Sequence, residues 1–294
     1  MDNYDIFKLI KYISQLFMEI TITDSNIEDF ANEIFDNIIE ITWNSFQFDE
    51  LIIKNFPNLQ RLNCWNNKTK SLDPLANCIN LRILHCSYNQ ITSLNPLANC
   101  VNLEELHCGR NQIISLNPLA NCINLRILRC DSNQITSLNP LANCINLQEL
   151  HCNTAQTTLL DPLANCVNLR ILYCYDNQIT SLNPLANCIN LQKLSCSHNQ
   201  ITSLDALANC TNLQSLCCRD NQITLLDPLA HCINLRVFYC LNNQITSFPY
   251  FLLAKNRANP LANCTNLQTL CCSGNQIILL NPLANCINLQ KLYC

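Results

Sequence analysis

The sequence is poor in glycine and in charge, and each shortage excludes a class of function. Its 294 residues include 2 Gly, Gly109 and Gly274, which lie far apart. This excludes a glycine-rich phosphate loop or a dinucleotide fingerprint, because both need several clustered glycines. Charged residues make up 13% of the chain and the formal net charge is −4. A chain without a basic field is poorly suited to phosphate backbones, so we expect no nucleic-acid partner.

The N-terminal segment lacks the features of a targeting or membrane sequence. Residues 1–5 are polar and acidic where a signal peptide would be basic, and the apolar stretch 6–20 is interrupted by lysines, a glutamate and other polar residues. We therefore expect no signal peptide and no membrane span. The expected location is intracellular and cytoplasmic.

From Leu59 to Cys294 the chain repeats one unit of 22 residues. Its consensus is L-x-x-L-x-C-x-x-N-Q-I-T-S-L-N-P-L-A-N-C-x-N, and we number its positions 1 to 22 from the first Leu; the starts at Leu81 and Leu103 show the period (103 − 81 = 22). Self-similarity at this period predicts a solenoid, because one unit is too small to bury its own apolar face. Function in such a fold lies on an extended surface more than in a pocket.

The chain has 23 Cys, and nearly all occupy position 6 or position 20 of the repeat. Both positions follow the apolar rhythm, so we interpret these cysteines as small core hydrophobes. Stacked repeats would place equivalent cysteines about 4.8 Å apart, but parallel side chains suit disulfide torsions poorly. The C-x-x-C spacing of zinc knuckles is also missing. We predict buried, reduced thiols, with partial oxidation and metal binding as the alternatives.

The stretch from Leu125 to Ile135, L-x-x-L-x-C-x-x-N-x-I, resembles the leucine-rich repeat family, with Cys in the third apolar slot. Its continuation to Asn143 resembles the 22-residue class of bacterial internalins and SDS22-like proteins. The richness in Cys, Asn and Ile also resembles uncharacterised leucine-rich repeat proteins of giant amoeba viruses. For a viral protein, the intracellular location would be the host cell. The resemblance implies an α/β fold: a right-handed solenoid with a concave parallel sheet and short 3₁₀ or α segments on its convex side. The family spans adhesion, phosphatase regulation, ligase adaptors and immune sensing, so the resemblance leaves function open.

The residue pattern predicts the same local structure. The alternation in L-x-x-L-x-C is typical of a short strand that pairs in parallel with its neighbours. The Asn at position 9 follows that strand, and we expect its amide to bond the backbone of the turn and of the next repeat. The segment Asn-Pro-Leu-Ala-Asn suits a tight turn and one helical turn, with Asn as cap and Pro early.

The N-terminal residues 1–37 lack the repeat. Apolar residues at helical spacing in 6–20 and 27–38, with a capping box at Ser25-x-x-Glu28, predict a helical cap over the end of the solenoid. The solenoid is expected over residues 38–294, with 38–58 as a degenerate first repeat.

Three places depart from the regular pattern. In the repeat that starts at Leu147, Ala155 replaces the Asn of position 9 and Thr157 replaces the Ile of position 11. Lost turn hydrogen bonds and a smaller apolar side chain predict a local weak point here. An insertion near 249–258 is either a lengthened convex helix or a binding loop. The chain ends inside an expected strand, residues 289–294, so we expect this edge to be covered by a second copy or another protein, or else to fray. The alternative is that the last strand is itself the cap.

We expect positions 2, 3, 5, 7 and 8 to face the concave side of the solenoid. The candidate partner-binding residues lie at position 5: His85, His107, Arg129, His151, Tyr173 and Tyr239. Because His85 and His107 would be neighbours on adjacent strands, a pH-sensitive or metal-binding row is one hypothesis. The other is a polar surface copied by duplication.

The sequence offers little for catalysis. A smooth solenoid has no pocket in which a Ser-His-Asp or paired-carboxylate arrangement can be placed, so we expect no enzyme and assign no catalytic residue, metal or cofactor. Cys217 and Cys271 are expected to be the most reactive thiols. The predicted function is a protein–protein interaction scaffold for an unidentified protein. The alternatives are an internalin-like surface adhesin, a thiol- or metal-dependent activity on the concave face, and a paralogue without a selected partner.

Overall fold

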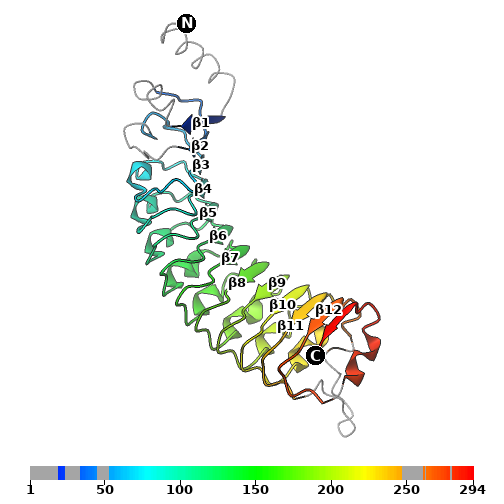
Figure 1. Ribbon diagram of the computed structural model, residues 1–294. Coiled ribbons are helices and arrows are strands. Elements are labelled where there is room, and N and C mark those ends of the chain that lie inside the picture. The colour runs from blue at the N-terminus through cyan, green and yellow to red at the C-terminus, as the bar shows by residue number, and fades with distance from the viewer. Residues whose placement is uncertain (1–18, 24–33, 45–52, 247–260, 262, 279) are drawn as a thin grey trace. The chain divides into compact units, whose positions relative to one another are not determined.

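The computed structural model describes residues 19–23, 34–44, 53–246, 261, 263–278 and 280–294. The chain divides into two compact units, Met1–Gln134 and Ile135–Cys294. In each unit short strands lie side by side, and single-turn 3₁₀ helices lie across the core from them (Figure 1). The expected insertion near 249–258 falls outside the described residues.

Among the residues that the structure describes, the first unit has six strands and three 3₁₀ helices. They are β1 (Glu19–Thr23), β2 (Glu40–Asn44), β3 (Arg61–Asn63), η2 (Asp73–Leu75), β4 (Ile83–His85), η3 (Asn95–Leu97), β5 (Glu105–His107), η4 (Asn117–Leu119) and β6 (Ile127–Arg129). Consecutive strands pair in parallel. From β3 onward, residues at the same repeat position are register partners on adjacent strands, as Leu84 and Leu106 are.

The second unit continues the same alternation. Its elements are η5 (Asn139–Asn143), β7 (Glu149–His151), η6 (Asp161–Leu163), β8 (Ile171–Tyr173), η7 (Asn183–Asn187), β9 (Lys193–Ser195), η8 (Asp205–Leu207), β10 (Ser215–Cys217), η9 (Asp227–His231), β11 (Val237–Tyr239), β12 (Thr269–Cys271), η10 (Asn281–Asn285) and β13 (Lys291–Tyr293). Each strand again pairs in parallel with the next.

The structure does not show the expected N-terminal helical cap. Residues 19–23 form β1 in register with β2, and a turn at Asp36–Asn37 precedes β2. The segment Glu19–Thr23 is rich in β-branched residues and alternates, with Ile22 buried, so strand pairing decides its conformation. Residues 1–18 and 24–33, which carry the rest of that prediction, lie outside the described residues.

The core consists of seven positions per repeat. In one complete repeat the fully buried residues are Leu169, Leu172, Cys174, Ile179, Leu182, Leu185 and Cys188. They include both cysteine positions, as the sequence predicted. Every cysteine lies within the described residues, and each is a thiol outside any disulfide. At position 20 the thiol points at the same position of the preceding repeat, as Cys210 Sγ does at 3.7 Å from Cys188 O.

Two asparagine rows connect the repeats. At position 9, Asn199 Nδ2 donates to Cys174 O, Cys196 O and Ser197 O, and its Oδ1 accepts from Ile179 N. The ladder therefore exists, but it bonds the preceding repeat where the sequence reasoning named the next one. At position 22 a second row, which sequence reasoning missed, donates to the preceding repeat as well. Asn212 Nδ2, for example, lies 3.2 Å from Ile189 O.

In six of the described 3₁₀ helices a serine, and not the expected asparagine, accepts a hydrogen bond from the first helical amide. At position 13, Ser181 Oγ accepts from Asn183 N at 3.1 Å, and the same bond begins η2, η3, η4, η5 and η8. The expected Pro lies early in nearly every one of these helices. A hydroxyl two residues before the amide suits this geometry, which is why the Asn at position 15 does not cap.

Candidate functional site

The strands present alternate side chains outward. In each strand from β4 to β11 the side chain at position 4 is buried, while those at positions 3 and 5 are partly or fully exposed. We call the surface formed by positions 3 and 5 the sheet face. It is the surface on which all six predicted partner-binding residues lie.

The structure brings some of these residues together within each unit. In the first unit, His85, His107 and Arg129 face one another in succession on β4, β5 and β6. In the second, His151 and Tyr173 are neighbours on β7 and β8, with ring centroids 4.5 Å apart.

The remaining predicted residue, Tyr239, lies apart from these two groups. It is on β11, between Cys217 and Cys271. The predicted residues therefore form one group of three and one pair, and Tyr239 lies by itself.

The two histidines of the first unit share a carboxylate. Their rings stack with centroids 4.1 Å apart and planes inclined by 5°. Glu105 Oε1 lies 2.7 Å from His85 Nε2 and 3.1 Å from His107 Nε2. All three side chains are partly buried. The three donor atoms converge on one point of the sheet face.

The second unit repeats part of this arrangement. Glu149 Oε1 lies 3.0 Å from His151 Nε2, but the strand that pairs with β7 in this unit, β8, carries Tyr173 in register with His151 and brings no second histidine. Sequence reasoning missed both glutamates. The available signal was an acidic residue two positions before a histidine, which the period of a strand places on the same face.

An aromatic and cationic cluster lies beside the sheet face in the first unit. Trp65 and Tyr88 are 52% and 47% exposed and meet edge to face at 5.5 Å between centroids. The Arg110 guanidinium lies 5.0 Å from the Tyr88 ring centroid. Tyr88 and Arg110 occupy position 8, where the backbone is left-handed in each repeat from Asn66 to Gly274, with φ between 51° and 69°. Sequence reasoning placed positions 7 and 8 on this side but did not single out these residues.

Most thiols are chemically inert. Burial raises the pKa of Cys122 and Cys188 to about 11 and that of Cys64 to about 12. Since the thiolate is the nucleophile and metal ligand, these groups react little near neutrality. Of the two thiols expected to be most reactive, Cys217 is partly exposed, but Cys271 is 8% exposed and its pKa is raised by burial. Cys294 is exposed, so we expect it to react in place of Cys271.

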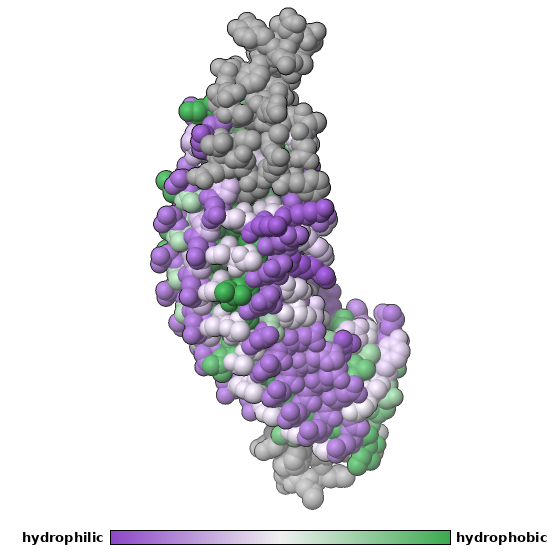
Figure 2. Space-filling view, turned by 60° about the vertical axis from the view of Figure 1, so that its left-hand side comes forward, coloured by the Kyte–Doolittle hydropathy of each residue, from purple (hydrophilic) through white to green (hydrophobic). Residues whose placement is uncertain are grey.

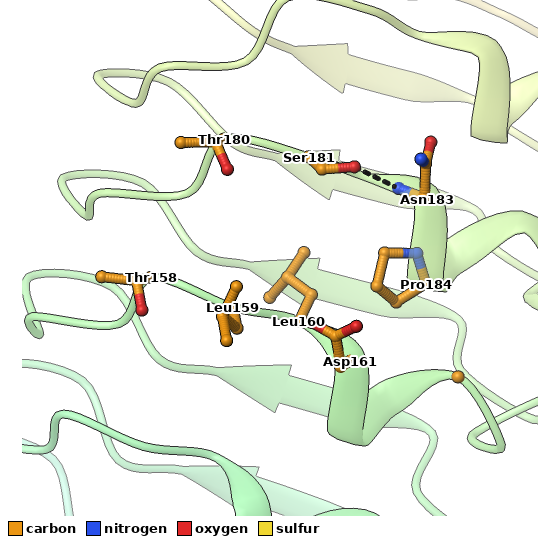
Figure 3. Close-up of a pocket in the computed structure, with 9 residues that line it drawn as sticks. Thr158, Leu159, Leu160, Asp161, Thr180, Ser181, Asn183 and Pro184 are labelled. Carbon is orange, nitrogen blue, oxygen red and sulfur yellow. Dashed lines mark hydrogen bonds between the residues drawn. The ribbon is translucent and has the colours of Figure 1, made fainter.

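A shallow depression on the helical side of the second unit offers no catalytic arrangement. Its volume is ≈ 360 Å³, and Asp161 is the titratable group among its nine lining residues. Figure 3 shows Leu159, Pro184 and the Ser181–Asn183 hydrogen bond around it. The lining is made of the turns that begin η6 and η7, so its form follows from repeat stacking.

The comparison with family models decides the identity of the repeat. The model described as "Leucine Rich repeats (2 copies)" matches residues 57–99, 79–121, 167–209, 189–231 and 211–253, which together cover about half of the chain. The chain belongs to the leucine-rich repeat family. No curated protein matches this leucine-rich repeat chain in sequence. Within the described residues, no helix has the length and apolar character that crossing a membrane requires.

Solved leucine-rich repeat structures resemble the chain in fold. An internalin, InlF of Listeria monocytogenes, is 24% identical over 95% of this chain and 87% of its own, with a TM-score of 0.68. The functional domain of L. monocytogenes InlJ, which includes a cysteine ladder, is 25% identical over 83% and 60% of the two chains, with a TM-score of 0.62. The plant peptide hormone receptor RGFR1, in complex with RGF2, is 17% identical over 88% and 47%, with a TM-score of 0.72.

Proposed function

We propose that this leucine-rich repeat protein is a scaffold that binds another protein or a peptide. The contact surface is the sheet face of each unit together with the Trp65–Tyr88–Arg110 cluster. That cluster is the observation that carries the proposal. Trp, Tyr and Arg are the residues enriched at the energetic centres of protein interfaces. Here an exposed Trp and Tyr pack on each other, and an arginine covers the tyrosine ring.

Many other exposed apolar side chains occur one per repeat, as Ile145, Val167 and Ile189 do at position 21. On the side that Figure 2 shows, hydrophilic residues cover most of the coloured area and the hydrophobic ones form small separate patches. Scattered apolar residues are normal on a soluble surface, whereas a stacked aromatic pair next to charged groups needs an explanation. The fold comparisons support the same type of function, since RGFR1 was solved in complex with RGF2.

The finer class and the location belong to this proposal. The 22-residue period and the likeness to InlF and InlJ support the internalin-like class. The many cysteines that remain thiols support an intracellular, reducing compartment, which would be the host cell if the resemblance to amoeba-virus proteins reflects origin.

Proximity labelling with the full chain, followed by titration of each recovered partner, tests the scaffold. Replacing Trp65 or Tyr88 by Ala, or combining His107→Glu with Arg129→Glu, should weaken binding by about 30-fold or more, the effect of losing roughly 2 kcal/mol. The matched controls Asn99→Ala, Asn143→Ala and Asn187→Ala lie on the helical side, are exposed, and should stay within about twofold.

Equal losses from both sets of variants, with the fold intact, would contradict a site on the sheet face. Recovery of cell-surface proteins alone would favour the adhesin alternative.

A further inference from the structure

We propose that His85, Glu105 and His107 form a binding site for a divalent transition-metal ion of the Zn²⁺ type on the sheet face of β4 and β5. The proposal is independent of the scaffold function, because it rests on the donor set and its geometry alone. Two imidazole nitrogens and one carboxylate oxygen form a donor set that zinc and its neighbours in the periodic table accept, with further positions left for water or a partner's side chain.

The donor atoms already converge. One ring nitrogen of His85, one of His107 and a carboxylate oxygen of Glu105 all lie within 4.8 Å of one another. Bond lengths of about 2.0–2.2 Å in a tetrahedral site require donors roughly 3.3–3.5 Å apart. The observed separations from Glu105 Oε1 are 2.7 and 3.1 Å. The Glu105 oxygen must therefore move away from the two nitrogens by roughly 0.2–0.8 Å. Because an imidazole binds a metal in the plane of its ring, the two stacked rings must also turn about their side-chain torsions so that both nitrogens face the ion.

The backbone fixes the three side chains in this arrangement. His85 and His107 are register partners on adjacent parallel strands, and Glu105 precedes His107 by two residues on the same face. Buried Leu84 and Leu106 anchor the two strands between repeats. Ligands on strands hold a metal geometry better than ligands on loops.

The cysteines behind this sheet do not provide the ligands. Cys86 and Cys108 follow the two histidines directly in sequence but point into the core, where burial raises their pKa well above the usual value. The protonated thiols are poor metal ligands. The exposed Cys294 and the partly exposed Cys217 can bind metals elsewhere, so a test must remove them.

The second unit supplies an internal control. Glu149 and His151 reproduce the carboxylate–imidazole pair at 3.0 Å, but neither neighbouring repeat has a histidine at position 5: the preceding one has Arg129 and the following one has Tyr173. A pair of donors holds such an ion far more weakly than three, so this half-site should not bind at concentrations that fill the first.

The experiment uses the full chain carrying Cys217→Ser and Cys294→Ser, kept reduced, and titrates it with Zn²⁺ or Co²⁺ alone against a chromophoric chelator. One ion should bind per chain. His85→Ala, His107→Ala and Glu105→Gln should each weaken binding by at least about tenfold, the lower end of what even outer-shell changes cost. His151→Ala, the matched control, should bind within about twofold of the parent. The bound Co²⁺ should show visible d–d absorption without thiolate charge-transfer bands.

Glu105→Gln preserves shape, so it keeps the test valid if a histidine variant fails to fold. Absence of stoichiometric binding, equal affinity in the His85→Ala and His151→Ala variants, or a thiolate spectrum accounting for all bound Co²⁺ would each overturn the site.

Discussion

Thr157 is the position at which a single substitution should stabilise the protein. It lies at position 11, where Ile135, Ile179 and Ile201 are fully buried in other repeats of the second unit, and it is itself 1% exposed. Its Oγ1 is buried and makes no hydrogen bond to any described residue. An unsatisfied buried hydroxyl costs about 1–3 kcal/mol. Thr157→Val removes the hydroxyl at nearly constant shape, so it should raise the free energy of unfolding by that amount.

Thr157→Ile should add about 0.8 kcal/mol for the extra methylene, bringing the gain to roughly 2–4 kcal/mol. Urea unfolding measures the global effect. Hydrogen exchange of the Gln178 amide, which bonds Thr157 O at 3.0 Å, measures the local one. Thr158→Val is the matched control: the neighbouring side chain is exposed, so the change should stay within about 0.5 kcal/mol. A lower unfolding midpoint for Thr157→Val than for the parent would refute the unsatisfied hydroxyl.

Three further predictions concern the asparagine rows and the cysteines. Asn199→Ala removes four hydrogen bonds of 2.9–3.1 Å and should cost about 3–5 kcal/mol in urea unfolding, whereas Asn212→Ala removes one exposed bond and should cost about 1 kcal/mol or less. Burial raises the pKa of Cys122 and Cys188 to about 11, so the folded state keeps thiol protons that the unfolded state loses above about pH 9. The free energy of unfolding should therefore be highest below about pH 8.5. It should fall as the pH rises to 11, by up to about 1.4 kcal/mol per thiol per pH unit. Urea midpoints that do not decrease between pH 7.5 and 10 would contradict this. Alkylation and mass spectrometry of the native protein should label Cys217 and Cys294 first and Cys271 only after unfolding.

The core could be predicted because every position is repeated. Leu, Cys and Ile recur at the same seven positions, so the apolar rhythm of one unit is checked by its neighbours, and burial confirms it. The segment 19–38 occurs once and has no such check. Its isoleucines fit helical spacing, but pairing of Glu19–Thr23 with β2 satisfies backbone groups that local periodicity does not count.

The site was predicted in part for a related reason. The strand period placed His85 and His107 side by side, and their rings stack. Glu105 was missed because the sequence was compared along position 5 alone. A glutamate at position 3 is long enough to reach His107 on its own strand and His85 diagonally on the neighbouring strand. The Trp65–Tyr88 contact depends on a left-handed residue at position 8, and Tyr88 does not signal that conformation by its type, in contrast to Asn66 and Gly274 at the same position.

The stability of the fold and the proposed binding depend on different positions of the repeat, which makes the proposed tests interpretable. The ladder and core positions are buried, so changes such as Asn199→Ala act mainly on stability. Side chains on the sheet face, such as His85 and His107, contact other side chains of that face. Substitutions there should change stability by about 0.5 kcal/mol or less. A loss of metal or partner binding in these variants therefore reports the site itself, and Asn199→Ala shows what a loss through unfolding looks like.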